Sequence, residues 1–117
     1  MTTAVVVLST AGSQDEAERI ATALVEERLA ACVNLVAPLT SIYRWRGAVE
    51  RAAEVLLVIK SRRALASRVI ARLAELHSYD VPEAIVLPIA SGSRAYLSWL
   101  MAETAAPPRS RARRPRK

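Results

Sequence analysis

The stretch from Ala31 to Lys60, ACVNLVAPLTSIYRWRGAVERAAEVLLVIK, decides the fold. It reads as two extended arms folded at Trp45-Arg46-Gly47, because both arms are rich in the β-branched and aromatic residues that favour strands. The second arm ends in the continuous apolar run Val55–Ile59, which is typical of a strand buried on both faces. We therefore predict a long β-hairpin.

The predicted hairpin is longer than the domain that carries it. An arm of about 13 residues spans about 43 Å, since a strand rises about 3.3 Å per residue. A compact domain of this size has a radius of gyration near 13 Å and hence a diameter of about 34 Å. Either the tip projects freely or another copy of the chain covers it, and the composition of the tip favours the second.

A two-residue turn at Arg46-Gly47 would also set the register of the hairpin. The predicted facing pairs are Trp45 with Ala48, Tyr43 with Glu50, and Leu39 with Glu54. Pro38 cannot donate to a ladder, so it predicts an edge position or a bulge. Aromatic and aliphatic side chains interleaved with carboxylates on one outer face indicate an interface or the rim of a site. The alternative is that the aromatic rings only shield the turn.

Length and composition predict a single domain that needs neither disulfide nor metal to fold, because 117 residues can bury a sizeable core. No apolar run approaches the roughly 18 residues of a membrane helix. The first residues, MTTAVVVLST, lack the basic start and cleavage pattern of a signal peptide. With a single cysteine, Cys32, the chain is expected to be cytoplasmic and to have no internal disulfide.

The formal charge of +6 comes from the tail. Six of the 17 basic residues lie in residues 107–117, PPRSRARRPRK, so 11 basic and 11 acidic residues remain in residues 1–106. Proline and like charges without large apolar residues predict a disordered basic tail after a folded domain. Such a tail suits binding to nucleic acid or an anionic surface. We favour the alternative, a solubilising or incidental extension.

The remaining segments complete the predicted order of strands and helices. The spacing of Ser13 and Glu16 predicts a capping box at the start of the first helix. The predicted elements outside the hairpin are a strand Ala4–Ser9, a helix from Ser13 to about Leu29, a helix Arg62–Leu76 capped by Ser61, a strand Ala84–Ile89 and a helix Arg94–Glu103. This order predicts an α+β, ferredoxin-like split βαβ fold with an antiparallel sheet and helices on one face. The apolar strands then require cover for the other face, which favours a symmetric oligomer.

The residues alone give little support for a catalytic or metal centre. His77 is the only histidine and Cys32 the only thiol, whereas a metal site needs three or four ligands. No Ser-His-Asp, CxxC or HExxH spacing occurs, so we expect a protein without enzymatic activity. Glu54 and Lys60 point to one face of a predicted interior strand, where a charge needs a partner. They form either a salt bridge at a subunit boundary or a ligand contact.

Taken together, these motifs resemble the CutA divalent-cation-tolerance family over nearly all of residues 4–103. The resemblance rests on the following segments: VVVLSTA, LAACVN, Ser41-x-Tyr43-x-Trp45-x-Gly47, Glu54, Lys60, His77-x-Tyr79-x-x-Pro82-Glu83 and Tyr96-Leu97-x-Trp99. It implies a ferredoxin-like protomer in a tight homotrimer whose long hairpins pair across subunit edges. It also implies a role in tolerance to copper and other divalent ions.

In the best-known bacterial members of that family, copper ligation involves a cysteine in the first strand and histidines before the Tyr-x-x-Pro-Glu segment. Here Ser9 stands at the cysteine position, His77 matches one histidine, and Leu76 precedes it. No cofactor is expected to be obligatory, and Cu(II) or another divalent cation is the candidate ligand.

Two functional hypotheses follow. The first is a cytoplasmic homotrimer that responds to divalent metal ions and binds them weakly or transiently near His77. The second is a ligand-sensing or adaptor trimer, by analogy of fold with the nitrogen-signalling PII trimers. Its inter-subunit cleft would be lined by Tyr43, Trp45, Glu54, Lys60 and Trp99. Neither hypothesis involves a membrane, and nucleic acid enters only through the tail.

Overall fold

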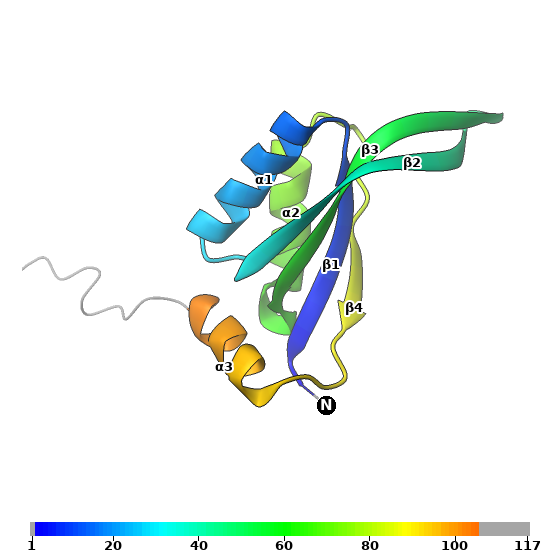
Figure 1. The fold of residues 1–117 in the computed structure, drawn as a ribbon. Coiled ribbons are helices and arrows are strands. Elements are labelled where there is room, and N and C mark those ends of the chain that lie inside the picture. Colours follow the sequence, from blue (N-terminus) through cyan, green and yellow to red (C-terminus); the bar gives the residue numbers. More distant parts are fainter. Residues whose placement is uncertain (1, 106–117) are drawn as a thin grey trace, which may run out of the picture.

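The computed structural model describes residues 2–105, and Figure 1 shows a sheet with two helices packed on one side and a long projecting hairpin. The sheet order is β2-β3-β1-β4, and all three neighbouring pairs are antiparallel. The elements are β1 (Ala4–Ala11), α1 (Gln14–Glu26), β2 (Cys32–Trp45), β3 (Ala48–Arg62), a 3₁₀ turn (Arg63–Leu65), α2 (Ala66–Leu76), β4 (Ile85–Pro88) and α3 (Arg94–Glu103). The predicted α+β split βαβ fold is confirmed, and the predicted basic tail lies outside the described residues.

The hairpin has the predicted turn and register. Trp45 faces Ala48, Tyr43 faces Glu50 and Leu39 faces Glu54. The register shifts between Val36 and Leu39, so Pro38 lies in the irregularity that its missing N–H predicts. Arg46 and Gly47 have φ values of 50° and 84°, as a two-residue hairpin turn requires. The described residues extend 58 × 34 × 22 Å, with the ends of β2 and β3 standing clear of the helices (Figure 1).

The core lies between the sheet and the helices α1 and α2. Alternate residues of each strand enter it, among them Val5 and Val7 from β1 and Leu57 and Ile59 from β3. Helix α1 contributes Ile20 and Leu24, and α2 contributes Val69 and Leu73. Leu65 and Leu76 pack against this cluster as well.

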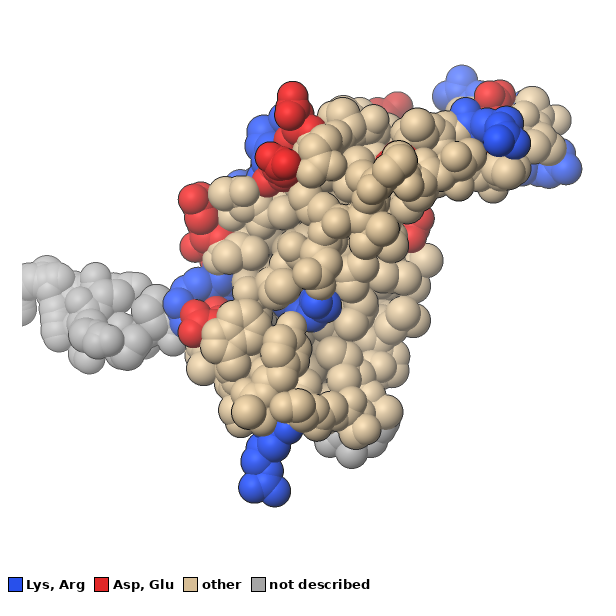
Figure 2. All heavy atoms as spheres, in the orientation of Figure 1, with Lys and Arg blue, Asp and Glu red and all other residues tan. Residues whose placement is uncertain are grey.

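The opposite face of the sheet is largely uncovered in a single chain. Leu56 and Val58 are half-buried, although their neighbours in sequence are buried in the core. The prediction that the run Val55–Ile59 is buried on both faces is therefore wrong for one chain, because only one side has helices against it. Val36, Ile85 and Leu87 are exposed. Figure 2 shows that this side of the body carries few charged side chains, whereas charges gather at the hairpin tip and along α1.

Helix α3 sits apart from α1 and α2, at the end of the sheet away from the hairpin tip (Figure 1). Its Leu100 packs with Ala4 and Ala31 in a second small core. The guanidinium of Arg62 donates to Thr104 and to the carbonyl of Met101. This helix, predicted as Arg94–Glu103, has those bounds.

Several predicted boundaries were wrong. β1 continues through Thr10 and Ala11, which pair with Leu56 and Val55 of β3. α1 ends at Glu26 rather than near Leu29, because Arg28 turns the backbone to a φ of 61°. β4 is Ile85–Pro88, shorter by one residue at each end than predicted.

Ser61 does not cap the second helix. It is buried in β3, and its hydroxyl donates to the carbonyl of Leu29 at 2.7 Å. α2 begins only at Ala66, after the 3₁₀ turn. None of the helices within residues 2–105 is long and apolar enough to cross a membrane.

Candidate functional site

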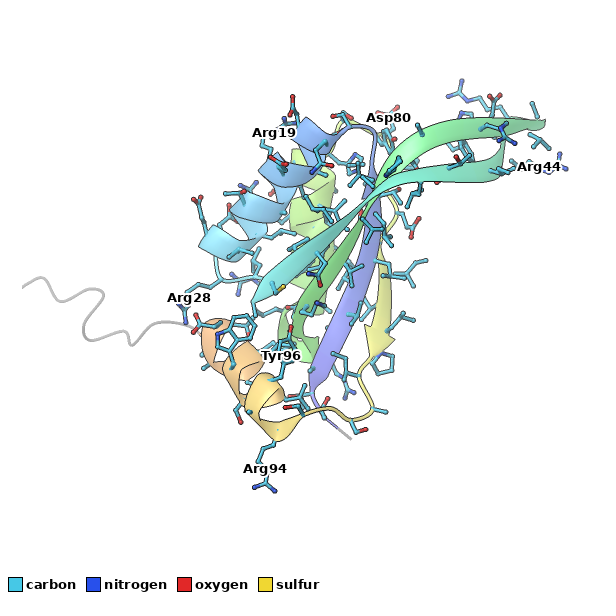
Figure 3. All side chains as sticks on the ribbon, in the orientation of Figure 1. Arg19, Arg28, Arg44, Asp80, Arg94 and Tyr96 are labelled. Atoms are coloured by element: carbon cyan, nitrogen blue, oxygen red, sulfur yellow. The ribbon has the colours of Figure 1, made fainter. Side chains whose placement is uncertain are left out.

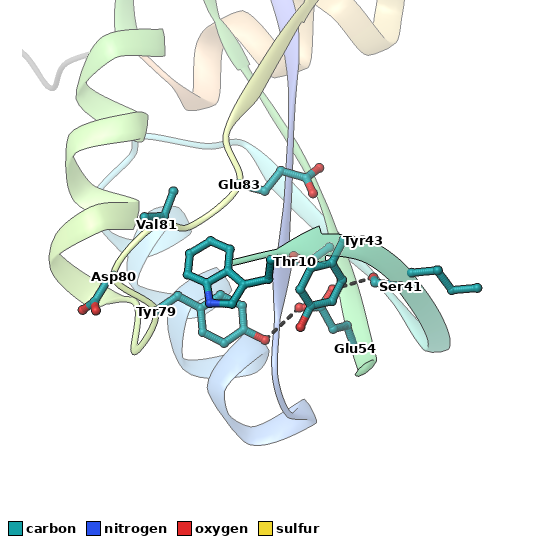
Figure 4. Close-up of a pocket in the computed structure, with 10 residues that line it drawn as sticks. Thr10, Ser41, Tyr43, Glu54, Tyr79, Asp80, Val81 and Glu83 are labelled. Carbon is teal, nitrogen blue, oxygen red and sulfur yellow. Dashed lines mark hydrogen bonds between the residues drawn. The ribbon is translucent and has the colours of Figure 1, made fainter. Parts of the chain in front are cut away.

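A groove of about 610 Å³ lies where the hairpin leaves the body of the protein. Its walls come from the hairpin, from the end of β1 and from the loop between α2 and β4 (Figure 4). The lining residues are Thr10, Ser41, Ile42, Tyr43, Trp45, Glu54, Tyr79, Asp80, Val81 and Glu83. Its volume falls within the usual range for small-molecule pockets, roughly 300 to 1,000 Å³.

The carboxylate of Glu54 is fixed in this groove by two hydroxyl groups. Ser41 Oγ donates to Glu54 Oε1 at 2.5 Å, and the Tyr79 hydroxyl donates to Glu54 Oε2 at 2.7 Å (Figure 4). Burial raises the pKa of Tyr79 above its ordinary value, and the hydrogen bond to Glu54 raises it further. The Tyr79 hydroxyl therefore keeps its proton near neutral pH and remains a donor.

The imidazole of His77 holds the loop that carries Tyr79. Its Nε2 lies 2.6 Å from the carbonyl oxygen of Thr10, so Nε2–H is the donor. Its Nδ1 accepts from the backbone N–H of Tyr79 at 3.0 Å. These two contacts define the Nε2–H tautomer. Both ring nitrogens are therefore occupied by the protein itself.

Glu16 supports the same loop from the start of α1. The hydroxyl of Ser13 accepts from the Glu16 backbone N–H at 3.1 Å, which confirms Ser13 as the N-cap. The Glu16 carboxylate accepts from the Ser78 N–H at 2.8 Å, and its Oε2 is 3.5 Å from His77 Nδ1. Burial alone would raise the pKa of Glu16, but the hydrogen bonds from Ser78 lower this pKa below 4.5.

Comparison with known proteins assigns this chain to a family. The family profile described as "CutA1 divalent ion tolerance protein" matches residues 5–103. The "Divalent-cation tolerance protein CutA" of Thermus thermophilus is 52% identical over 99 residues, which cover 85% of this chain and 96% of that protein. The chain belongs to the CutA1 divalent ion tolerance family.

Other CutA relatives come from plants and animals. The chloroplastic protein CutA of Arabidopsis thaliana is 42% identical over 100 residues, covering 86% of this chain and 55% of that protein. Human protein CutA is 43% identical over 91 residues, covering 78% and 51%. The chain thus spans about half the length of these two relatives.

Solved CutA structures have the same fold. The Thermus thermophilus protein superimposes with a TM-score of 0.85 at 51% identity, covering 87% of this chain and 99% of that one. CutA of Xylella fastidiosa gives a TM-score of 0.87 at 38% identity, covering 89% of this chain and all of that one. The family resemblance read from the sequence motifs is confirmed.

The copper-ligand set that the family resemblance implied is incomplete in this chain, since Ser9 stands at the cysteine position and Leu76 at a histidine position. His77 is buried, with both nitrogens hydrogen-bonded, and Leu76 packs against the core. Ser9 is fully buried on the helix side of β1, and its hydroxyl has no hydrogen-bond partner among the described residues. Cys32 begins β2. Within residues 2–105 no three His, Cys, Asp or Glu side chains are arranged to hold a metal ion.

Three of the five predicted cleft residues line the groove, namely Tyr43, Trp45 and Glu54. Lys60 does not, because it lies six residues from Glu54 along β3, or about 20 Å at the rise of a strand. It donates instead to the side chain of Asn34. Glu54 and Lys60 therefore form no salt bridge with each other within one chain.

Trp99 also lies elsewhere in the chain. It packs against Tyr96 of α3 in a tilted arrangement, with ring centroids 5.5 Å apart. Figure 3 shows Tyr96 near one end of the molecule and Asp80 at the base of the hairpin. That a second CutA subunit brings Lys60 or Trp99 to the groove stays a prediction.

The contribution of the α2–β4 loop was missed. Tyr79, Asp80 and Glu83 line the groove, whereas the sequence indicated this segment only as part of the family motif. The Tyr79-x-x-Pro82-Glu83 spacing of the CutA motif was the signal that marked it. Thr10 was missed because the predicted first strand ended at Ser9, two residues before the observed end of β1.

Proposed function

We propose that the protein acts as a homotrimer in the cellular response to divalent metal ions, including copper, without catalysing a reaction. The observation that carries this proposal is the CutA1 family match over residues 5–103. The cytoplasmic location stays a prediction, since the relatives include a protein named as chloroplastic and one named as periplasmic.

Two features support a homotrimer. The uncovered face of the sheet is apolar, and such a face needs a partner. It carries Leu56, Val58, Ile85 and Leu87. The hairpin also projects beyond its own domain with Ile42 and Val49 more than 60% exposed. Packing of identical sheet faces and hairpins around one axis would cover both surfaces in a closed assembly.

Metal binding in this proposal is weak or transient. A metal ion reaches His77 Nδ1 only if the Tyr79 N–H releases it, and that substitution costs a buried hydrogen bond. The groove offers carboxylates of Glu54, Asp80 and Glu83, which attract divalent cations without forming a closed coordination shell. We therefore place the weak attraction at the groove and give His77 a structural role.

Growth in graded copper sulfate tests the cellular function. A bacterial host lacking its own CutA should tolerate more copper when it expresses this chain than when it carries the empty vector. Unchanged tolerance with normal expression would contradict the proposed role.

Titration tests the metal site. Calorimetry with Cu(II) should give equal weak affinity for the wild type and for Ser78→Ala. A His77→Ala variant, checked for folding by circular dichroism, should differ by less than a few-fold. Loss of copper binding in a folded His77→Ala variant would assign the site to His77 after all. Native mass spectrometry of the same samples should show three chains, and a stable monomer at micromolar concentration would exclude the trimer.

The groove itself favours a second candidate function, the sensing of a small ligand. Tyr43, Trp45 and Tyr79 give it aromatic walls, and Glu54 gives it a fixed polar group. Apolar walls with a few placed polar groups are typical of ligand pockets. A ligand-dependent change in the stability of the trimer would support this function.

A further inference from the structure

The groove is acidic. Glu54, Asp80 and Glu83 line it, and none of its ten lining residues is lysine, arginine or histidine. Among residues 2–105, none of these three carboxylates takes part in a salt bridge. A ligand that enters the groove therefore meets three carboxylates that have no salt-bridge partner among residues 2–105.

The groove is also aromatic. Tyr43 and Trp45 approach from β2, and Tyr79 approaches from the α2–β4 loop. Figure 4 shows the hydroxyl of Tyr79 pointing at the Glu54 carboxylate, with the ring of Tyr43 drawn over that carboxylate in this view. The guanidinium of Arg46 lies 5.6 Å from the centroid of the Trp45 ring, which is an existing cation–aromatic contact at this end of the groove.

The central carboxylate is preorganised. The Ser41 hydroxyl donates to one oxygen of Glu54 and the Tyr79 hydroxyl donates to the other. Together they hold the carboxylate in one orientation. A carboxylate has about four acceptor sites, so further acceptor capacity remains for a ligand. Little rotational freedom is lost when a ligand binds, which favours affinity.

A bare metal ion suits this arrangement poorly. Divalent cations need several oxygen or nitrogen ligands within a short radius, and residues 2–105 show no such cluster. An alkylated ammonium group has a low charge density and is attracted to aromatic faces. Its alkyl groups also gain from contact with the walls of a groove that holds about 610 Å³.

We propose that the groove formed by Tyr43, Trp45, Glu54 and Tyr79 binds a small organic cation that carries an alkylated ammonium group. The inference rests on the second candidate function and names its ligand class. The aromatic rings contact the alkyl groups of the cation, and the carboxylates of Glu54, Asp80 and Glu83 neutralise its charge.

Choline and its neutral isostere 3,3-dimethylbutan-1-ol form the decisive pair of probes, because they share a shape and differ in charge. Each is titrated into the ¹⁵N-labelled full chain while amide and indole N–H resonances are followed. Choline should shift the Trp45 indole resonance in a saturable manner and leave that of Trp99 unchanged. The neutral alcohol should bind about tenfold more weakly, as expected for loss of a cation–aromatic contact together with a charge pair. Equal binding of the two probes, or no saturable shift with choline, would overturn the proposal.

Variants then locate the charge and the ring that matter. Glu54→Gln should weaken choline binding about tenfold. Glu50→Gln changes a carboxylate of the same strand that does not line the groove, and it should leave binding unchanged. Tyr43→Leu should weaken choline binding, whereas Tyr96→Leu on α3 should not. Equal affinity of Glu54→Gln and the wild type would also overturn the proposal.

The test separates this inference from the proposals on which it builds. Thermal melting confirms that each variant is folded, and the comparison of choline with its isostere on the wild type needs no variant at all. Native mass spectrometry of the titrated samples reports the trimer independently. If the protein is a trimer but does not bind choline, only the proposed ligand class is refuted. If the chain raises copper tolerance without binding choline, the proposed role in the response to metal ions still stands.

Discussion

The hydroxyl of Tyr79 donates a hydrogen bond to Glu54 Oε2 at 2.7 Å, which joins the α2–β4 loop to the base of the hairpin. Glu54 lies on β3, 25 residues earlier in the chain. His77 and Glu16 anchor the other side of the loop to β1 and α1. The groove is therefore shaped by a continuous set of hydrogen bonds that runs from α1 to the hairpin.

Tyr79→Phe should lower the free energy of unfolding by about 1 kcal/mol, because it removes one hydrogen bond and leaves Glu54 with a single donor. Chemical denaturation in urea measures the change. Tyr96→Phe removes a hydroxyl from a tyrosine on α3 that is 41% exposed, and it should change stability by less than about 0.5 kcal/mol. Equal effects of the two variants would show that the contact to Glu54 contributes no stability.

Acid should lower the free energy of unfolding through protonation of Glu16. Its pKa is lower in the folded protein than the ordinary value of 4.5, so its contribution to stability is fully present above that pH. The contribution is lost as the pH falls through the lower folded-state pKa. Glu16→Gln should therefore flatten the acid limb of a plot of unfolding free energy against pH.

The matched control for that experiment is Glu26→Gln, which changes an exposed carboxylate of the same helix. It should leave the acid limb as in the wild type. An unchanged acid limb in Glu16→Gln would assign the acid sensitivity to other groups.

Two neighbouring residues of α1 should differ sharply in their contribution to stability. Leu24 is fully buried in the main core, so Leu24→Ala should cost about 2 to 5 kcal/mol through lost burial and a cavity. Val25 is 41% exposed, and Val25→Ala should cost less than about 0.5 kcal/mol. Urea denaturation of both variants checks this, and similar losses would mean that the helix packs through another face.

Assembly should depend on the uncovered face of the sheet. Leu56→Glu places a charge in the middle of that face, so it should reduce the fraction of trimer because burying an unpaired charge is costly. Thr22→Glu adds the same charge to an exposed position of α1 and should leave the trimer intact. Light scattering after size-exclusion chromatography gives the mass of each. A trimeric Leu56→Glu variant would place the subunit interface elsewhere.

Local pattern was sufficient to predict the hairpin. The β-branched arms, the Arg46-Gly47 turn and the alternation of side chains led to the observed facing pairs, because the geometry of a tight turn fixes the register. Pro38 marked the irregularity for the same local reason. The final helix was also predicted within its observed bounds.

Contacts between distant segments could not be read in this way. Ser61 has the side chain of a helix cap, yet it is used in β3 to bind the carbonyl of Leu29. The single histidine suggested a metal ligand, and only the positions of Thr10 and the Tyr79 N–H show that both of its nitrogens are engaged. Tertiary neighbours decided these roles, so the groove was predicted from its hairpin side alone.

β2 has 14 residues and forms an outer edge of the sheet. A single chain therefore exposes a long row of unpaired backbone donors and acceptors along β2, and such a row is a template for fibril growth. The irregularity at Pro38 divides that row into two shorter pieces. Rapid association after synthesis would thus protect the protein from misassembly as well as complete its architecture.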